Sequence, residues 1–255
     1  GLADEAYLNR YVANLEELKG HLDGIDIDEA CERSGIARAD LEEAAELLGA
    51  AETVAVIFGG DVLRSADGVA KSTAVMNLAL VSGALHGDIG GLFPIDEKGN
   101  TQGLLDMGVY PESLPGYRDY QDAGPFEKAW GKKLPQGGRD ALGILEGIEK
   151  GEIRALYLAA TNPLVSFPDS GRWLKALDKV EFLVVQDILS SDLSHKAHVV
   201  LPGAAPVEKT GSVTSLDHRI SCLGKAYEPP GQSREDWDIL SDLYGRLDKN
   251  FDAGR

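Results

Sequence analysis

The sequence predicts an α/β protein: a parallel sheet in Rossmann-like layers with flanking helices, a helical N-terminal part and a long irregular segment. Three observations predict this fold. From residue 139 onward, short apolar runs alternate with helix-length segments across short links. Before residue 50, apolar side chains recur at helical spacing instead. Between Gly87 and Pro135, Gly, Pro, Asn and Asp dominate and no period persists, which is typical of a functional loop or an interface.

The N-terminal elements follow from periodicity and from start and stop signals. Apolar spacing predicts a helix over 5–22, and a helical hairpin follows it. Gly35 is expected to end the first helix of this hairpin, and Asp40 is expected to cap the second. A β-branched run over 53–58 predicts a buried parallel strand, and the apolar stretch 68–85 predicts the helix after it.

The C-terminal part alternates helices and strands. The pattern predicts helices over 139–151, 170–179 and 190–197, and strands over 153–159, 181–186 and 198–201. The turn-rich stretch 203–232 is expected to hold a small strand pair, and 233–247 an amphipathic helix. We expect residues 1–95 to end one α/β domain, and residues 96–255 to form a second one, with the irregular loop 87–135 and the C-terminal helix.

Composition excludes several classes of protein. The net charge of −17 argues against binding to nucleic acid or to anionic lipid, because both need clustered Lys and Arg. No apolar stretch reaches the roughly 20 residues that a membrane-spanning helix needs, so no direct membrane insertion is expected. Cys31 and Cys222 form no CxxC pair, which disfavours an iron–sulfur cluster or structural zinc built from this chain alone. The chain starts without Met inside a helical pattern, which suggests a piece of a longer protein.

Two predicted parallel strands end in small or amide-bearing polar residues. Thr161-Asn162-Pro163 follows one strand, and Gln186-Asp187 ends the next. Ligands of open α/β sheets lie at this carboxyl edge, where amides can read donors and acceptors on a heterocycle. Asn-Pro and Asp also start turns and cap helices, so the residues alone leave both interpretations open. Gly59-Gly60 follows an earlier strand, but GGDVLR lacks the third glycine of a dinucleotide fingerprint, and a tight turn is the better interpretation.

Other polar groupings give no catalytic or metal site. His195 and His198 lie three residues apart beside Asp192, but no third convergent ligand is evident. No nucleophile elbow or poised acid–base pair is visible. The pair Glu235-Asp236 is most simply a solvated helix face.

Four separated stretches, in order, resemble one superfamily. They are NTQGLLDMGVYPESLPGY, ATNPLVSFPD, EFLVVQDILSSDLSHKAHVVLPGAAPVEKTGSVTSLDHRI and EPPGQSREDWDIL. They are similar to the molybdopterin oxidoreductases of the DMSO reductase type. This superfamily includes formate dehydrogenases, nitrate reductases and the large G-type subunit of NADH-quinone oxidoreductase, respiratory complex I. The resemblance covers most of the chain from Val54 onward.

The resemblance implies a cofactor and the residues that hold it. Family members carry Mo or W on two pterin guanine dinucleotides between α/β domains. The implied cofactor-binding residues are Thr161, Asn162, Pro163, Gln186 and Asp187 at the guanine and phosphate–sugar parts, Gln102 and Asp106 beneath the cofactor, and Gly60 from the facing half.

The chain also departs from the family pattern. It has neither the Cys-rich segment for iron–sulfur clusters nor the segment with the metal-ligating Cys or selenocysteine, and the family's C-terminal β-barrel would begin after residue 255. We therefore expect no catalytic residue, no metal ligand and no cofactor in this piece alone. Formate dehydrogenases place an Arg near the metal where this chain has Asp96, which would repel formate.

Three functions remain open. The first is a fragment of a G-type subunit of complex I, which Asp96 favours. The second is a fragment of an active Mo or W formate dehydrogenase, which the intact NxQGxxDMG loop favours. The third is a non-catalytic scaffold that docks a partner through 87–135. The expected partners are other subunits of a respiratory or formate-oxidising complex, and the fragment itself is expected to self-associate. Its expected location is the cytoplasm, at the inner face of the membrane through partner subunits.

Overall fold

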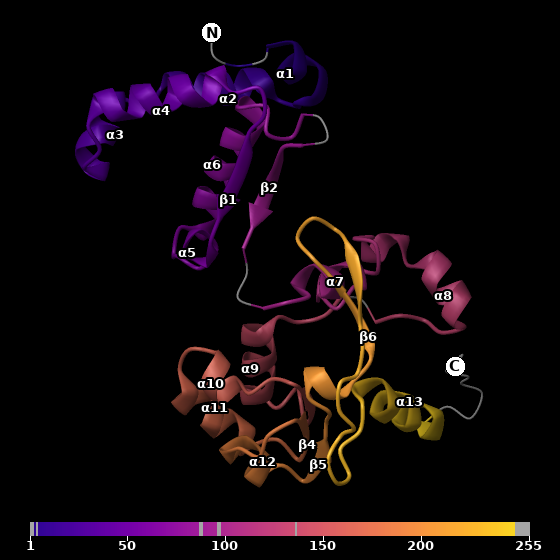
Figure 1. Ribbon diagram of the computed structural model, residues 1–255. Coiled ribbons are helices and arrows are strands. Elements are labelled where there is room, and N and C mark those ends of the chain that lie inside the picture. The colour runs from indigo at the N-terminus through magenta and orange to yellow at the C-terminus, as the bar shows by residue number, and fades with distance from the viewer. Residues whose placement is uncertain (1–2, 4, 87–88, 96–97, 136, 248–255) are drawn as a thin grey trace. The chain divides into compact units, whose positions relative to one another are not determined.

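The computed structural model describes residues 3, 5–86, 89–95, 98–135 and 137–247 (Figure 1). Asp96 lies outside these residues, so the structure does not bear on its role. The chain divides into two compact units, Gly1–Gly99 and Asn100–Arg255, which we call unit 1 and unit 2. Among the described residues, no helix is both long enough and apolar enough to cross a membrane.

Unit 1 begins with four helices. They are α1 (Glu5–Tyr11), α2 (Leu15–Asp23), α3 (Ile27–Ser34) and α4 (Arg38–Ala50). The single helix predicted over 5–22 is wrong, because Asn14 adopts a left-handed conformation (φ 57°) and separates α1 from α2. Gly35, with φ 72°, ends α3 as predicted. The prediction that Asp40 caps the next helix is wrong, because the cap is Ala37 and Asp40 lies in the first turn of α4.

A strand–helix–strand unit follows. It comprises β1 (Ala55–Phe58), α5 (Gly60–Leu63), α6 (Gly68–Val81) and β2 (Gly91–Pro94). The two strands pair in parallel, with Ala55 opposite Gly91. The predicted strand and helix are confirmed, whereas β2 lies inside the segment predicted to be irregular.

The rest of that segment, 98–135, also contains short regular elements. These are α7 (Thr101–Asp106), the 3-10 turn η1 (Tyr120–Asp122) and α8 (Gly124–Trp130). Elements this short cannot establish a visible period, which is why the sequence reads as irregular. Gly108 is required where α7 ends: its φ is +70°, and a Cβ there would lie 2.5 Å from the Pro115 nitrogen.

Unit 2 is the α/β part that the sequence predicts. Its elements in order are α9 (Ala141–Glu149), β3 (Ala155–Ala159), α10 (Pro163–Ser166), α11 (Ser170–Leu177), β4 (Phe182–Asp187), α12 (Asp192–Lys196) and β5 (Val199–Pro202). The strands form a parallel sheet in the order β3-β4-β5. Parallel strands joined through helices confirm the predicted fold class.

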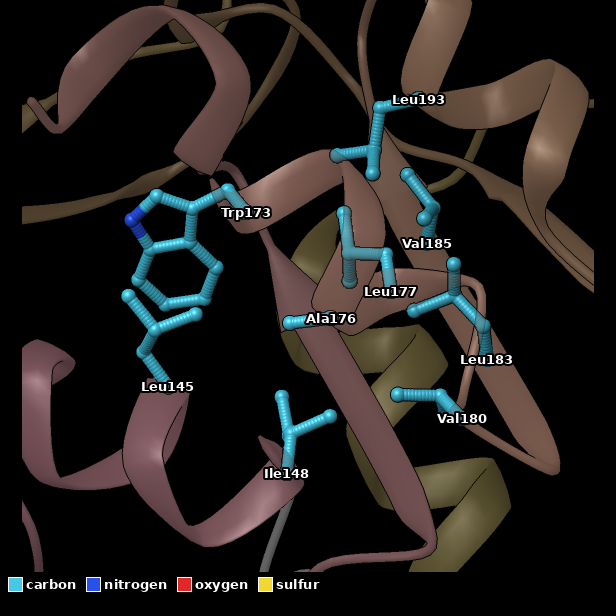
Figure 2. Packing of buried hydrophobic residues seen from close by; sticks show 9 residues of the cluster. All are labelled: Leu145, Ile148, Trp173, Ala176, Leu177, Val180, Leu183, Val185 and Leu193. Carbon is cyan, nitrogen blue, oxygen red and sulfur yellow. The ribbon is translucent and has the colours of Figure 1, made fainter. Parts of the chain in front are cut away.

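One face of this sheet carries the main hydrophobic core. Leu183 and Val185 alternate onto that face and pack against side chains from α9, α11 and α12. Figure 2 shows Trp173 of α11 against Leu145 of α9, with Leu177 close to the strand residues. Packing on this face fixes the strands, and with them the edge where β3 and β4 end.

The other face meets the C-terminal helix α13 (Asp236–Leu247), which Figure 1 places across the sheet from α11 and α12. Leu243 of α13 lines an apolar pocket together with Tyr157 and Val184 of the sheet. Between β5 and α13 lie the 3-10 turn η2 (Pro206–Glu208) and the predicted strand pair, β6 (Gly211–Thr214) and β7 (Ile220–Leu223), which is antiparallel.

Candidate functional site

The structure brings the two polar strand ends together. Ala159 is paired with Gln186 in the register of β3 and β4, and the Ala160 N–H donates to the Gln186 carbonyl over 2.8 Å. Thr161-Asn162-Pro163 and Gln186-Asp187 therefore share the carboxyl edge of one sheet, as a common ligand site requires. We call these two segments the β3 tip and the β4 tip.

The β3 tip is a strained turn that starts a helix. Ala160 has a φ of +52°, an uncommon conformation for a residue with a Cβ. The Asn162 side-chain oxygen accepts the Leu164 N–H at 3.0 Å and so caps α10. Pro163, buried, occupies the first position of that helix. Asn162 therefore caps the helix through its side-chain oxygen, as one of the two interpretations predicts. The N–H groups of its amide take no part in this bond.

In the β4 tip, Gln186 and Asp187 have different surroundings. The Gln186 side chain is only 2% exposed, its oxygen accepts from the Tyr157 hydroxyl, and its Nε2 donates to Asp236 over 2.5 Å. Asp187 is partly buried, and its Oδ1 accepts the Ile188 N–H over 2.7 Å. The Gln186 side chain therefore points into the protein. The bond between Asp187 and the Ile188 N–H involves one of the two carboxylate oxygens of Asp187.

The interpretation of Glu235-Asp236 as a solvated face is wrong. Asp236, the first residue of α13, accepts from Gln186 and pairs with the Lys209 ammonium. One oxygen of Glu235 accepts both the backbone N–H and the hydroxyl of Thr210, each over 3.1 Å. These partners lie 25 to 50 residues apart in sequence, so no local spacing could have identified them.

Two pKa shifts follow from this arrangement. Burial, together with the charge of Asp236, raises the pKa of Tyr157, so its hydroxyl stays protonated and donates. The Thr210 N–H lowers the pKa of Glu235, which therefore stays ionised. Both shifts keep the hydrogen-bond directions around α13 fixed.

Gln102 and Asp106 form a second polar group within unit 2. They lie one turn apart on α7, and Gln102 Nε2 donates to Asp106 over 2.7 Å and to the Tyr117 hydroxyl over 2.6 Å. Tyr117 has a φ of +58°, which is unusual for an aromatic residue. Asn100, which precedes α7, accepts the Thr214 N–H over 2.9 Å and so joins this segment to β6.

The remaining predicted positions lie elsewhere. Gly60 begins α5 in unit 1, directly after β1, and a Cβ there would meet the Arg64 side chain at an ordinary 3.5 Å. His198 Nδ1 accepts the Leu183 N–H over 3.0 Å, so this ring supports the sheet, and His195 is exposed on α12. No group of three or more metal-ligating side chains gathers among the described residues.

The chain is similar in sequence to the alpha subunits of two known enzymes. The NADPH-Fe(3+) oxidoreductase subunit alpha of Geobacter sulfurreducens is 47% identical over 248 residues, covering 97% of this chain and 29% of that protein. The F420-dependent formate dehydrogenase subunit alpha of Methanocaldococcus jannaschii is 34% identical, covering 96% of this chain and 37% of that protein. The chain thus spans about a third of the length of these curated relatives.

A solved structure shows the same fold. Acetylene hydratase from Pelobacter acetylenicus superposes with a TM-score of 0.73 at 15% identity, over 96% of this chain and 37% of that one. The model of the family described as molybdopterin oxidoreductase matches residues 26–246, which is most of the sequence. By this match, the chain belongs to the molybdopterin oxidoreductase family.

Proposed function

We propose that this chain forms one wall of the cofactor site in the alpha-type subunit of a molybdopterin oxidoreductase. The observation that carries the proposal is the meeting of the β3 and β4 tips at one sheet edge. The family cofactor would supply the redox chemistry at its metal. The residues of this chain would bind and orient the nucleotide end of that cofactor.

The chemistry of the two tips fits a guanine nucleotide. A guanine base offers N–H donors on one edge and two acceptors, O6 and N7, on another. The Asp187 carboxylate can accept two N–H groups, whereas the Asn162 amide and the Thr161 hydroxyl can donate. We propose these three as direct contacts, Pro163 as the rigid support of the turn, and Gln186 as an internal support.

The other predicted positions would contribute from outside the sheet edge. We propose that Gln102 and Asp106, held together by their own hydrogen bond, lie against the pterin side of the cofactor. We propose that Gly60, at the start of α5, also contacts the cofactor, because the absence of a side chain permits close backbone contact.

We further propose that the parent enzyme takes electrons from a reduced nicotinamide nucleotide. The 47% identity to an NADPH-Fe(3+) oxidoreductase subunit exceeds the 34% identity to a formate dehydrogenase subunit. Its partners would be other subunits of such a complex, with iron–sulfur clusters outside the matched region. More narrowly, we propose that the complete protein is a G-type subunit of NADH-quinone oxidoreductase, which Asp96 favours. It would place the protein in the cytoplasm, at the inner face of the membrane through partner subunits.

Cofactor content of the complete subunit tests the site. Asp187→Asn replaces an acceptor-only group with one that also donates, and Asn162→Ala removes the amide. Each should lower the Mo or W and the guanine nucleotide retained per polypeptide by roughly tenfold. Asp122→Asn, an exposed carboxylate change on η1, is the matched control. Full cofactor content in both site variants would contradict the proposal.

The choice of electron donor tests the proposal that the enzyme oxidises a reduced nicotinamide nucleotide. The complete complex should oxidise NADH or NADPH and should not oxidise formate. Turnover with formate at a comparable rate would favour the formate dehydrogenase interpretation instead. The isolated 255-residue chain is expected to show no turnover and no stoichiometric Mo, W or Fe, which metal analysis of the purified chain checks.

A further inference from the structure

A polar chain centred on the buried Gln186 connects the β4 tip to distant segments. Its members are Tyr157, Gln186, Asp236 and Lys209, linked in that order by hydrogen bonds and an ion pair. They come from β3, β4, the start of α13 and the turn after η2. The almost fully buried amide of Gln186 thus joins β3 and the start of α13 to β4, and Lys209 joins the chain through Asp236.

The direction of each bond in this chain is determined by its members. An ionised carboxylate only accepts, so Asp236 must receive the Gln186 N–H, and the Gln186 oxygen then faces the donating Tyr157 hydroxyl. Lys209 pairs with the partly exposed carboxylate of Asp236 and so holds it beside the amide. The amide of Gln186 therefore has one favourable orientation.

The backbone of the same tip is held as well. The Gly203 N–H donates to the Asp187 carbonyl over 3.0 Å, and Ala160 donates to the Gln186 carbonyl. Successive side chains in a strand point to opposite faces. Fixing Gln186 on the α13 face therefore fixes where Asp187 projects on the other face.

We propose that Asp236, paired with Lys209, is a positioning residue that acts through Gln186 to orient the Asp187 carboxylate toward the bound nucleotide. This inference rests on the proposed function of the sheet edge. It assigns to the start of α13 a role in ligand affinity that a solvated helix face would not have.

The decisive experiment is a double-mutant cycle in the complete subunit. Asp236→Asn gives the position a group that can also donate, so the Gln186 amide can turn over. We expect a loss of retained guanine nucleotide of roughly tenfold, as for other residues that orient a ligand-binding group. In an Asp187→Asn background, the same change should cause little further loss, because the group that it positions is already impaired.

Conservative and matched variants separate positioning from general stability. Lys209→Arg keeps the ion pair and should retain the nucleotide, whereas Lys209→Met should lose it. Glu149→Gln breaks a bidentate ion pair with Arg172, at 2.8 and 2.6 Å, and should lower the thermal midpoint without loss of nucleotide. If Asp236→Asn does not yield folded protein, the two Lys209 variants decide the question.

The outcomes are distinguishable. Equal losses from Asp236→Asn in both backgrounds would show a merely structural role and overturn the inference, as would full retention in Asp236→Asn. Normal nucleotide content in Asp187→Asn would overturn the role of Asp187 and the inference with it, and normal content in Asn162→Ala as well would overturn the proposed site itself.

Discussion

The two units differ in how completely they bury their apolar side chains. In unit 2, nine buried residues from α9, α11, α12, β4 and the turn before β4 form one cluster. In unit 1, the described residues form two clusters of three buried residues each. Helix α6 is rich in apolar residues, yet Val69 is 85% exposed. Apolar helix surface of this kind is typically covered by other protein, so unit 1 leaves surface on α6 for further contacts.

The largest expected difference concerns core leucines. Leu193, fully buried in unit 2, should lose about 2–5 kcal/mol of unfolding free energy on substitution by Ala. Leu47→Ala on the exposed surface of α4 should change it by less than about 0.5 kcal/mol. Urea unfolding of the three proteins measures both changes. Similar losses of unfolding free energy in Leu193→Ala and Leu47→Ala would contradict the difference in burial between these two positions.

Amide hydrogen exchange on the whole chain should show the same contrast. Central strand β4 is paired on both sides, whereas β1 has a single described partner. We expect protected amides of β4 to exchange more slowly than those of β1 by about tenfold or more, or roughly 1.4 kcal/mol. Equal protection in the two strands would indicate that the chain unfolds as one cooperative unit.

Self-association should depend on unit 1. Exposed apolar surface promotes association, so the apparent mass in sedimentation should rise with concentration. Val69→Lys on α6 should weaken this association several-fold, and Leu142→Lys on α9 of unit 2 should weaken it less. A clean monomer across a wide concentration range would refute the expectation.

The smallest effect concerns ion pairs and pH. Arg172 lowers the pKa of Glu149 below its ordinary value of 4.5, so the pair stabilises the folded state above that pH, and this contribution is lost as the pH falls through the lowered pKa. Glu149→Gln should therefore lower the thermal midpoint near neutral pH, and the difference should shrink in acid. Glu16→Gln, in an exposed pair with Lys19 of unit 1, should have no measurable effect. A difference that grows in acid would contradict the assignment.

Much of the fold could be predicted because its signals are local. The strands of the three-stranded sheet are short apolar runs, and the glycine that ends α3 follows a general rule for helix ends. Strand β2, four residues long and without alternation, gives no such signal. The cap of α4 was missed because Ala37 makes no side-chain hydrogen bond there, so nothing in the sequence marks it.

One part of the candidate site could be predicted from the sequence, and another part could not. Parallel strands end at one edge, so the meeting of the β3 and β4 tips at that edge follows from topology. The partners of Gln186 could not be predicted, because Asp236 is 50 residues away and reaches it only after α13 packs on the sheet. Long-range polar contacts of this kind depend on tertiary packing and leave no period in the sequence.

The left-handed backbone of Ala160 has a consequence for the energetics of the turn. An L-residue in this conformation costs about 1–2 kcal/mol that glycine would not. Ala160→Gly should relieve this cost while enlarging the set of shapes open to the unfolded chain. With alanine at this position, the folded turn is strained, but the unfolded chain has fewer backbone conformations than it would have with glycine.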